Sequence, residues 1–248
     1  MATKNIAPGT LPEGFSIKND SLFKGKEEAP HDARTVSRMQ KVLHAKSDLP
    51  SETVTYKMYR GIWQKGTMRF DVTILPPMLL GDEPNKTFGH YHPSGKDGIP
   101  FPEIYEVLSG EAHFLLQTHD PKNISQTERA ILVSAKKGDI VLMQPYFGHL
   151  TINSGKAPLA LANLVFANFS SDYSAYEKLH GGAFYELAGG SLVPNAHYLT
   201  CPLEKTSAAD FAKAFGHPKF SHSLYELAQK DISQFAFLEN PLLLLKKY

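Results

Sequence analysis

The chain has 248 residues, of which 42% are hydrophobic and 21% charged, the balance of a folded protein rather than a disordered one. Its 26 Lys and Arg against 25 Asp and Glu give a net charge of +1, so composition gives no reason to expect nucleic acid or an anionic membrane as a partner. With Cys201 as its single cysteine and no apolar stretch long enough for a signal peptide or membrane span, we expect a cytoplasmic protein without disulfides that acts on small molecules.

Residues 1–50 predict an N-terminal arm followed by a short helix. The first 31 residues are mostly polar and show no regular apolar period, which is typical of an irregular segment. Asp32 is a suitable N-cap for the helix, and Val36 and Met39 then fall on one helical face with Leu43.

Residues 51–186 predict an all-β domain. Short runs rich in Val, Ile, Leu, Tyr and Phe alternate with turns rich in Gly, Pro and Asn, as in a β-sandwich or barrel. The expected strands lie at residues 54–60, 70–75, 103–108, 112–117, 130–134, 139–143, 149–153 and 159–167.

Residues 187–248 predict a helical C-terminal extension packed on the barrel. One helix is expected to start at Thr206 or Ser207 and to end at Gly216, and another to start at about Ser221.

Four residues in the β domain form a candidate metal site. His90 and His92 are separated by one residue, so on a strand both side chains point to the same side. Glu103 and His149 each stand at the start of an expected strand. Imidazole nitrogens with one carboxylate suit a divalent transition metal: Fe2+ is the first choice, and Mn2+, Ni2+, Co2+ or Zn2+ are alternatives. Glu106 is a second carboxylate on the same strand, but it faces the other side from Glu103.

Each of these residues alone has an ordinary explanation, since pairs of histidines are common on surfaces and a single buried histidine is usually hydrogen-bonded in the core. It is their joint spacing that favours a metal site. Six other histidines lack such partners and are expected to be surface or packing residues or to support a ligand from behind: His113, His119, His180, His197, His217 and His222.

The order of these residues resembles the two sequence motifs of cupins. Residues 89–92 (GHYH), with Glu103 and Gly110 after them, are similar to the first motif, although the insert 93–102 is longer than usual. Gly138 and His149 are similar to the second motif. The resemblance implies a cupin β-barrel, also called a double-stranded β-helix or jelly roll.

A closer resemblance is to the cupin-type, or archaeal-type, glucose-6-phosphate isomerase family. It rests on the segments 56–59 (YKMY), 73–75 (TIL), 87–92 (TFGHYH), 102–105 (PEIY), 115–118 (LLQT) and 145–153 (PYFGHLTIN). Asp172-Tyr173 also matches the family, whereas Ser171 replaces a family histidine and a family tyrosine falls near Val165.

The resemblance implies a metal-dependent interconversion of glucose 6-phosphate and fructose 6-phosphate, a homodimer, and a site built from matching positions. Its metal ligands would be His90, His92, Glu103 and His149, and its catalytic residues Glu103 and Tyr105. Its substrate-binding residues would be Tyr56, Thr73, Thr87, Gly89 and Tyr173. Proton transfer through an enediol and a hydride shift are both open as routes.

Because no basic cluster lies near the motifs in sequence, hydroxyls and backbone amides are expected to hold the phosphate. Three other functions remain open: another sugar-phosphate isomerase, such as one acting on mannose 6-phosphate, an Fe(II) dioxygenase, and a sugar-binding protein without activity.

Overall fold

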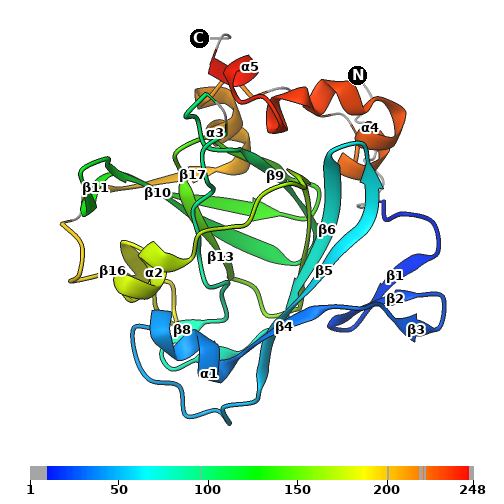
Figure 1. Cartoon of the computed structure of the whole chain (residues 1–248). Coiled ribbons are helices and arrows are strands. Elements are labelled where there is room, and N and C mark those ends of the chain that lie inside the picture. Colours follow the sequence, from blue (N-terminus) through cyan, green and yellow to red (C-terminus); the bar gives the residue numbers. More distant parts are fainter. Residues whose placement is uncertain (1–9, 96, 200, 218–219, 221, 246–248) are drawn as a thin grey trace, which may run out of the picture.

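The computed structural model describes residues 10–245, apart from 96, 200, 218–219 and 221. In this part of the chain, strands form two large sheets and three small ones (Figure 1). The larger sheet has the order β12 (Ile140–Met143), β9 (Glu103–Ser109), β14 (Leu159–Phe166), β6 (Met68–Leu75), β5 (Val54–Lys65) and β4 (Asp32–Thr35). The second has the order β13 (Gly148–Asn153), β10 (Glu111–Asp120), β11 (Asn123–Lys136) and β17 (Leu203–Ser207).

The remaining elements are short. The small sheets pair β1 (Phe15–Lys18) with β2 (Ser21–Lys24) and β3 (Glu27–Glu28), β7 (Leu79–Leu80) with β8 (Glu83–Pro84), and β15 (Phe184–Glu186) with β16 (Leu192–Pro194). The α-helices are α1 (Val36–Met39), α2 (Ser174–Lys178), α3 (Ala208–Ala214), α4 (Leu224–Lys230) and α5 (Leu242–Leu245), and the 3-10 helices are η1 (Gln40–Val42) and η2 (Ile232–Leu238). No helix in the described residues is both long and apolar enough to cross a membrane.

The six-stranded sheet is buried on both faces. Its inner face turns toward the four-stranded sheet, where Val107 of β9 belongs to the same core cluster as Phe114 of β10. Its outer face belongs to a second cluster, in which Ile104 packs with Leu224 and Phe235 of the C-terminal helices. Burial on both faces explains why β14 reads as a nearly continuous apolar run. Two facing sheets of this kind form the cupin fold, which confirms the all-β class predicted from the sequence.

The N-terminal segment differs from the prediction. Residues 15–28 are not irregular but form the sheet β1–β2–β3, and Asp32 begins the edge strand β4 instead of capping a helix. Asp32 pairs with Met58 of β5, so long-range strand pairing outweighs its local capping preference. Helix α1 follows from Val36, and Val36 and Met39 are both buried, as their spacing predicted.

The C-terminal segment contains strands as well as helices. β17 adds to the four-stranded sheet by pairing with β11, the only parallel pair among the described strands. Ser207 caps α3 by accepting a hydrogen bond from Asp210 N, which confirms the predicted start. The next helix begins at Leu224 with Ser223 as its cap, whereas Ser221 lies outside the described residues.

Candidate active site

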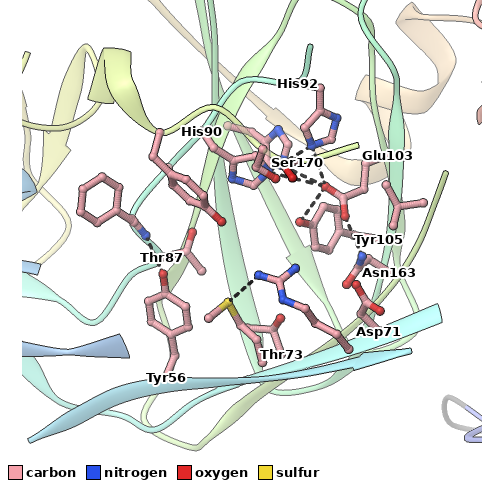
Figure 2. Close-up of a pocket in the computed structure, with 18 of the residues that line it drawn as sticks. Tyr56, Asp71, Thr73, Thr87, His90, His92, Glu103, Tyr105, Asn163 and Ser170 are labelled. Atoms are coloured by element: carbon pink, nitrogen blue, oxygen red, sulfur yellow. Dashed lines mark hydrogen bonds and ion pairs between the residues drawn. The ribbon is translucent and has the colours of Figure 1, made fainter. Parts of the chain in front are cut away.

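The structure brings His90, His92, Glu103 and His149 together in a single cluster. Figure 2 shows His90, His92 and Glu103 close together at the wall of a cavity. The backbones of His90 and His149 pair through two hydrogen bonds, 3.1 and 3.0 Å long. The side chains of His90 and His92 point to the same side, with their Nε2 atoms 3.1 Å apart. Glu103 opens β9 and places its Oε2 at 3.3 Å from Nε2 of both His92 and His149, and 3.9 Å from Nε2 of His90.

The protonation of this cluster suits metal ligands. Nδ1 of His92 lies 2.8 Å from the carbonyl oxygen of Phe101, which can only accept, so Nδ1 carries the proton and Nε2 presents a lone pair. Burial lowers the pKa of His90 well below its ordinary value, and it also lowers the pKa of His149. Burial alone would raise the pKa of the Glu103 carboxyl, but His149 and His92 hold it well below its ordinary range. Neutral imidazoles and an ionised carboxylate are the forms that bind metals.

The distances between the donor atoms fit a metal ion, and some of these atoms have no other partner. Metal bonds of about 2.0 to 2.2 Å place ligands at right angles about 3 Å apart, close to the observed 3.1 and 3.3 Å. Both ring nitrogens of His149 are buried without a hydrogen-bond partner among the described residues, a costly state that an ion at Nε2 would relieve. Lone pairs that face one another repel, and a cation between them removes this repulsion. Three imidazole nitrogens and one carboxylate oxygen are a donor set that suits a divalent transition metal.

The Glu103 carboxylate is oriented by two neighbours. Its Oε1 accepts a hydrogen bond of 2.6 Å from Asn163 Nδ2, and its Oε2 accepts one of 3.0 Å from the Tyr105 hydroxyl. Asn163 is the one polar residue of β14, where it lies opposite Tyr105 in register and is 5% exposed. A buried amide in an apolar strand is favourable only when paired, so Asn163 fixes which oxygen of Glu103 faces the histidines.

We therefore expect Asn163→Leu to weaken metal binding by roughly 10 to 100-fold, the usual effect of removing a hydrogen bond to a ligand. Titration of the metal-free protein with Mn2+ or Fe2+ measures this affinity. Asn163→Gln retains an amide and serves as the matched variant, from which a smaller loss is expected. Equal affinity in Asn163→Leu and wild type would contradict an orienting role.

A cavity of about 370 Å3 opens beside the cluster, and every site residue predicted from the sequence lines it. Figure 2 shows Tyr56 and Thr73 across this space from His92 and Glu103. The predicted residues that line it are Tyr56, Thr73, Thr87, Gly89, His90, His92, Glu103, Tyr105, His149 and Tyr173. Glu106 faces away, as expected, and its Oε2 accepts a hydrogen bond of 2.7 Å from Leu224 N.

Three of the predicted substrate-binding residues already have structural contacts. Thr87 Oγ1 accepts a 2.9 Å hydrogen bond from Thr151 N and keeps its own proton for another partner. The Tyr56 hydroxyl accepts a 3.3 Å bond from Phe88 N, and burial raises the pKa of Tyr56 to about 12, so it stays protonated. Gly89 has a φ of 88°, and a Cβ there would lie 2.3 Å from the Tyr176 ring, so this position admits only glycine.

No basic cluster lies near the motifs in sequence, but the fold brings three arginines to the site. Arg34, Arg60 and Arg69 line the same cavity. They come from β4, β5 and β6, far from the histidine motifs in the sequence, and only the pairing of these strands places them together. Asp71 and Asn163 also line the cavity and were not predicted. The alternation of Arg69, Asp71 and Thr73 along β6 was the one available signal, since it places all three on one face.

A family model described as "Glucose-6-phosphate isomerase (GPI)" matches residues 31–200. This is more than half of the chain and includes all four candidate metal ligands. The chain belongs to the glucose-6-phosphate isomerase family. The match confirms both the resemblance seen in the sequence and the assignment of the chain as an enzyme.

Three glucose-6-phosphate isomerases from Thermococcus and Pyrococcus are similar to part of this chain. "Glucose-6-phosphate isomerase" of Thermococcus litoralis is 34% identical over 169 residues, which cover 65% of this chain and 83% of that protein. The protein of the same name from Pyrococcus furiosus is 28% identical over 172 residues, with the same two coverages. That of Pyrococcus abyssi is 34% identical over 110 residues, 44% of this chain and 52% of that protein. In this chain, β17 and the helices after it follow the residues 31–200 that the family model matches.

Proposed function

We propose that this chain interconverts glucose 6-phosphate and fructose 6-phosphate with a divalent transition metal held by His90, His92, Glu103 and His149. The observation that carries the proposal is the set of four converging donor atoms at the wall of a cavity, in a member of this isomerase family. Fe2+ is the first candidate, because three imidazoles and one carboxylate suit it. When bound, the metal would act as a Lewis acid toward the substrate oxygens at C1 and C2.

The residues around the metal ligands have separate roles in this proposal. Glu103 accepts the proton from one carbon and returns it to the other, because it is the described carboxylate that faces the histidines, whereas Asp71 is occupied by Arg69. Burial, together with the charge of Glu103, raises the pKa of Tyr105 well above its ordinary value, so Tyr105 remains a hydrogen-bond donor. Its hydroxyl contacts Glu103 Oε2 and can pass a proton between that oxygen and a substrate hydroxyl.

The phosphate in this proposal lies toward Tyr56, Thr73, Thr87, Gly89 and Tyr173. These residues line the part of the cavity that is not occupied by the metal ligands, and they offer hydroxyls and a backbone amide as donors. Tyr173 is partly exposed, and its ring centroid lies 5.4 Å from that of His90, so it contacts the candidate metal ligands as well as the cavity.

For this reason we expect Thr73→Val to raise the Michaelis constant for fructose 6-phosphate roughly 10-fold, since losing a hydrogen bond to a charged group costs about 1.5 to 3 kcal/mol. Thr73 is a cleaner choice than Thr87, whose replacement would also leave Thr151 N without its acceptor. Steady-state kinetics of Thr73→Val and Thr73→Ser, together with their melting temperatures, measure the effect. A Michaelis constant unchanged in both would place the phosphate elsewhere.

Purification followed by metal analysis and an assay of fructose 6-phosphate conversion, with and without a chelator, tests the proposed function as a whole. Conversion that is lost with chelator and restored by a divalent metal is the expected result. Absence of conversion with every metal tested would contradict the proposal. Mannose 6-phosphate, assayed in parallel, tests the choice of sugar.

A further inference from the structure

The cavity holds a surplus of positive charge. Arg34, Arg60 and Arg69 contribute three positive charges, and Asp71 and Glu103 are the carboxylates among the described lining residues. With the buried histidines neutral, the wall has a net charge of +1, and a divalent metal would raise this to +3. An enclosed site with that balance attracts a dianion.

The three arginines differ in how far they are neutralised. Arg69 Nε lies 2.9 and 3.0 Å from the two oxygens of Asp71, so its charge is fully paired. Arg60 Nε lies 3.2 Å from Asp32 Oδ2, and the two side chains are 40% and 66% exposed, so solvent weakens this pair. Arg34 has no ion pair with any carboxylate in the described part of the chain.

Arg34 is held with its guanidinium in the cavity and one donor unused. It lies opposite Tyr56 in the register of β4 and β5, and its Cζ lies 5.3 Å from the centre of the Tyr173 ring. Its Nε is buried and has no hydrogen-bond partner among the described residues. A buried N–H of a charged group is costly when unpaired, which indicates that a ligand completes this site.

Arg60 reaches the same region. Burial alone would lower the pKa of Arg34 and of Arg60, but Tyr56 and Tyr173 raise the pKa of Arg34, Tyr173 and Asp71 raise that of Arg60, and the pKa of each is raised overall. Arg60 Nη2 lies 3.5 Å from Met58 Sδ, two residues earlier on β5. Arg34 and Arg60 therefore line the same cavity from the neighbouring strands β4 and β5.

We propose that Arg34 is the principal anchor of the substrate's phosphate, with Arg60 as a weaker second contact. The inference rests on the proposed function and deepens it, because it assigns the charge of the phosphate to a residue outside the sequence motifs. The planar guanidinium presents paired N–H donors that match two phosphate oxygens, a geometry that lysine cannot supply. The hydroxyls of Tyr56 and Thr87 then orient a group whose charge the arginine binds.

The test compares Arg34→Leu and Arg34→Lys with wild type in two measurements. Isothermal titration with inorganic phosphate reports anion binding without turnover, and kinetics report the Michaelis constant for fructose 6-phosphate. For Arg34→Leu, the dissociation constant for phosphate and the Michaelis constant for fructose 6-phosphate are expected to rise by the same factor, roughly 10 to 100-fold. The turnover number and the metal content should change little. Arg34→Lys should weaken phosphate binding less than Arg34→Leu does. Arg60→Leu should weaken it by roughly 3-fold.

Arg129→Leu is the matched control, because the Arg129 side chain is 42% exposed, is paired with Glu204 and lies on β11 outside the cavity. Its phosphate affinity should equal that of wild type. The inference is overturned if an Arg34 variant that keeps the melting temperature of wild type also binds phosphate as tightly as wild type. If wild type binds phosphate, the Arg34 variants do not, and wild type still fails to convert fructose 6-phosphate, then the role of Arg34 is supported and the proposed function is contradicted.

Discussion

His149→Ala is expected to reduce metal content to near zero and to abolish isomerase activity with it. His149 is 2% exposed, and both of its ring nitrogens lack hydrogen-bond partners among the described residues, so metal coordination is the role that its buried position supports. Removing a ligand should cost more than the 10 to 100-fold loss of affinity that follows removal of a group supporting a ligand. Metal analysis of the purified variant, with activity measured in parallel, gives the result.

His90→Ala and His92→Ala should behave in the same way. His197→Ala is the matched control, because His197 is exposed and lies outside the cavity. Full metal occupancy in all three cavity variants would remove the metal site from the proposal. Melting temperatures of the metal-free proteins separate this effect from loss of fold.

Glu103→Gln is expected to lower the turnover number by about 100-fold or more, because it keeps the shape of the side chain but removes the basic carboxylate. The amide oxygen of the substituted side chain could still accept a hydrogen bond from Asn163 Nδ2, which binds Oε1 of Glu103 at 2.6 Å, so the local packing should persist. The Michaelis constant for fructose 6-phosphate should change little, since the proposed phosphate contacts lie elsewhere in the cavity.

Metal content must be measured in the same variant, because Glu103 has two roles in the proposal. Retained metal with lost turnover supports its role as the base, whereas lost metal supports its role as a ligand. Activity close to that of wild type would contradict both roles. Glu204→Gln, a change at an exposed ion pair on β17, is the control.

The short motifs predicted the four candidate metal ligands because each ligand stands in a recognisable local pattern. His90 and His92 are two residues apart, and each further donor begins a strand that the apolar pattern marks clearly. Alternation along β9 also separated Glu103 from Glu106 correctly. The fold class followed from the same short strands, because turn residues stand at regular intervals between them.

The missed features depend on pairing between distant segments. Arg34 reaches the cavity only because β4 pairs with β5, and Asn163 reaches Glu103 only because β14 lies beside β9. Asp32 was assigned to a helix cap from its local preference, whereas strand pairing decides its conformation. Nothing in the local pattern of residues 203–207 separates a strand in the main sheet from a loop before α3, so β17 was not predicted.

The pairing of β17 with β11 has a consequence for how the chain is made. β11 has an apolar centre at Ile131, Leu132 and Val133, and its outer edge is covered by residues 203–207, which are synthesised much later. Until those residues emerge from the ribosome, β11 is an open edge that can pair with a strand of another molecule. Without β17, the apolar centre of β11 would lie on the edge strand of the sheet, whereas β17 (Leu203–Ser207, LEKTS) replaces that apolar edge with a short polar one, the kind of edge that disfavours pairing between molecules.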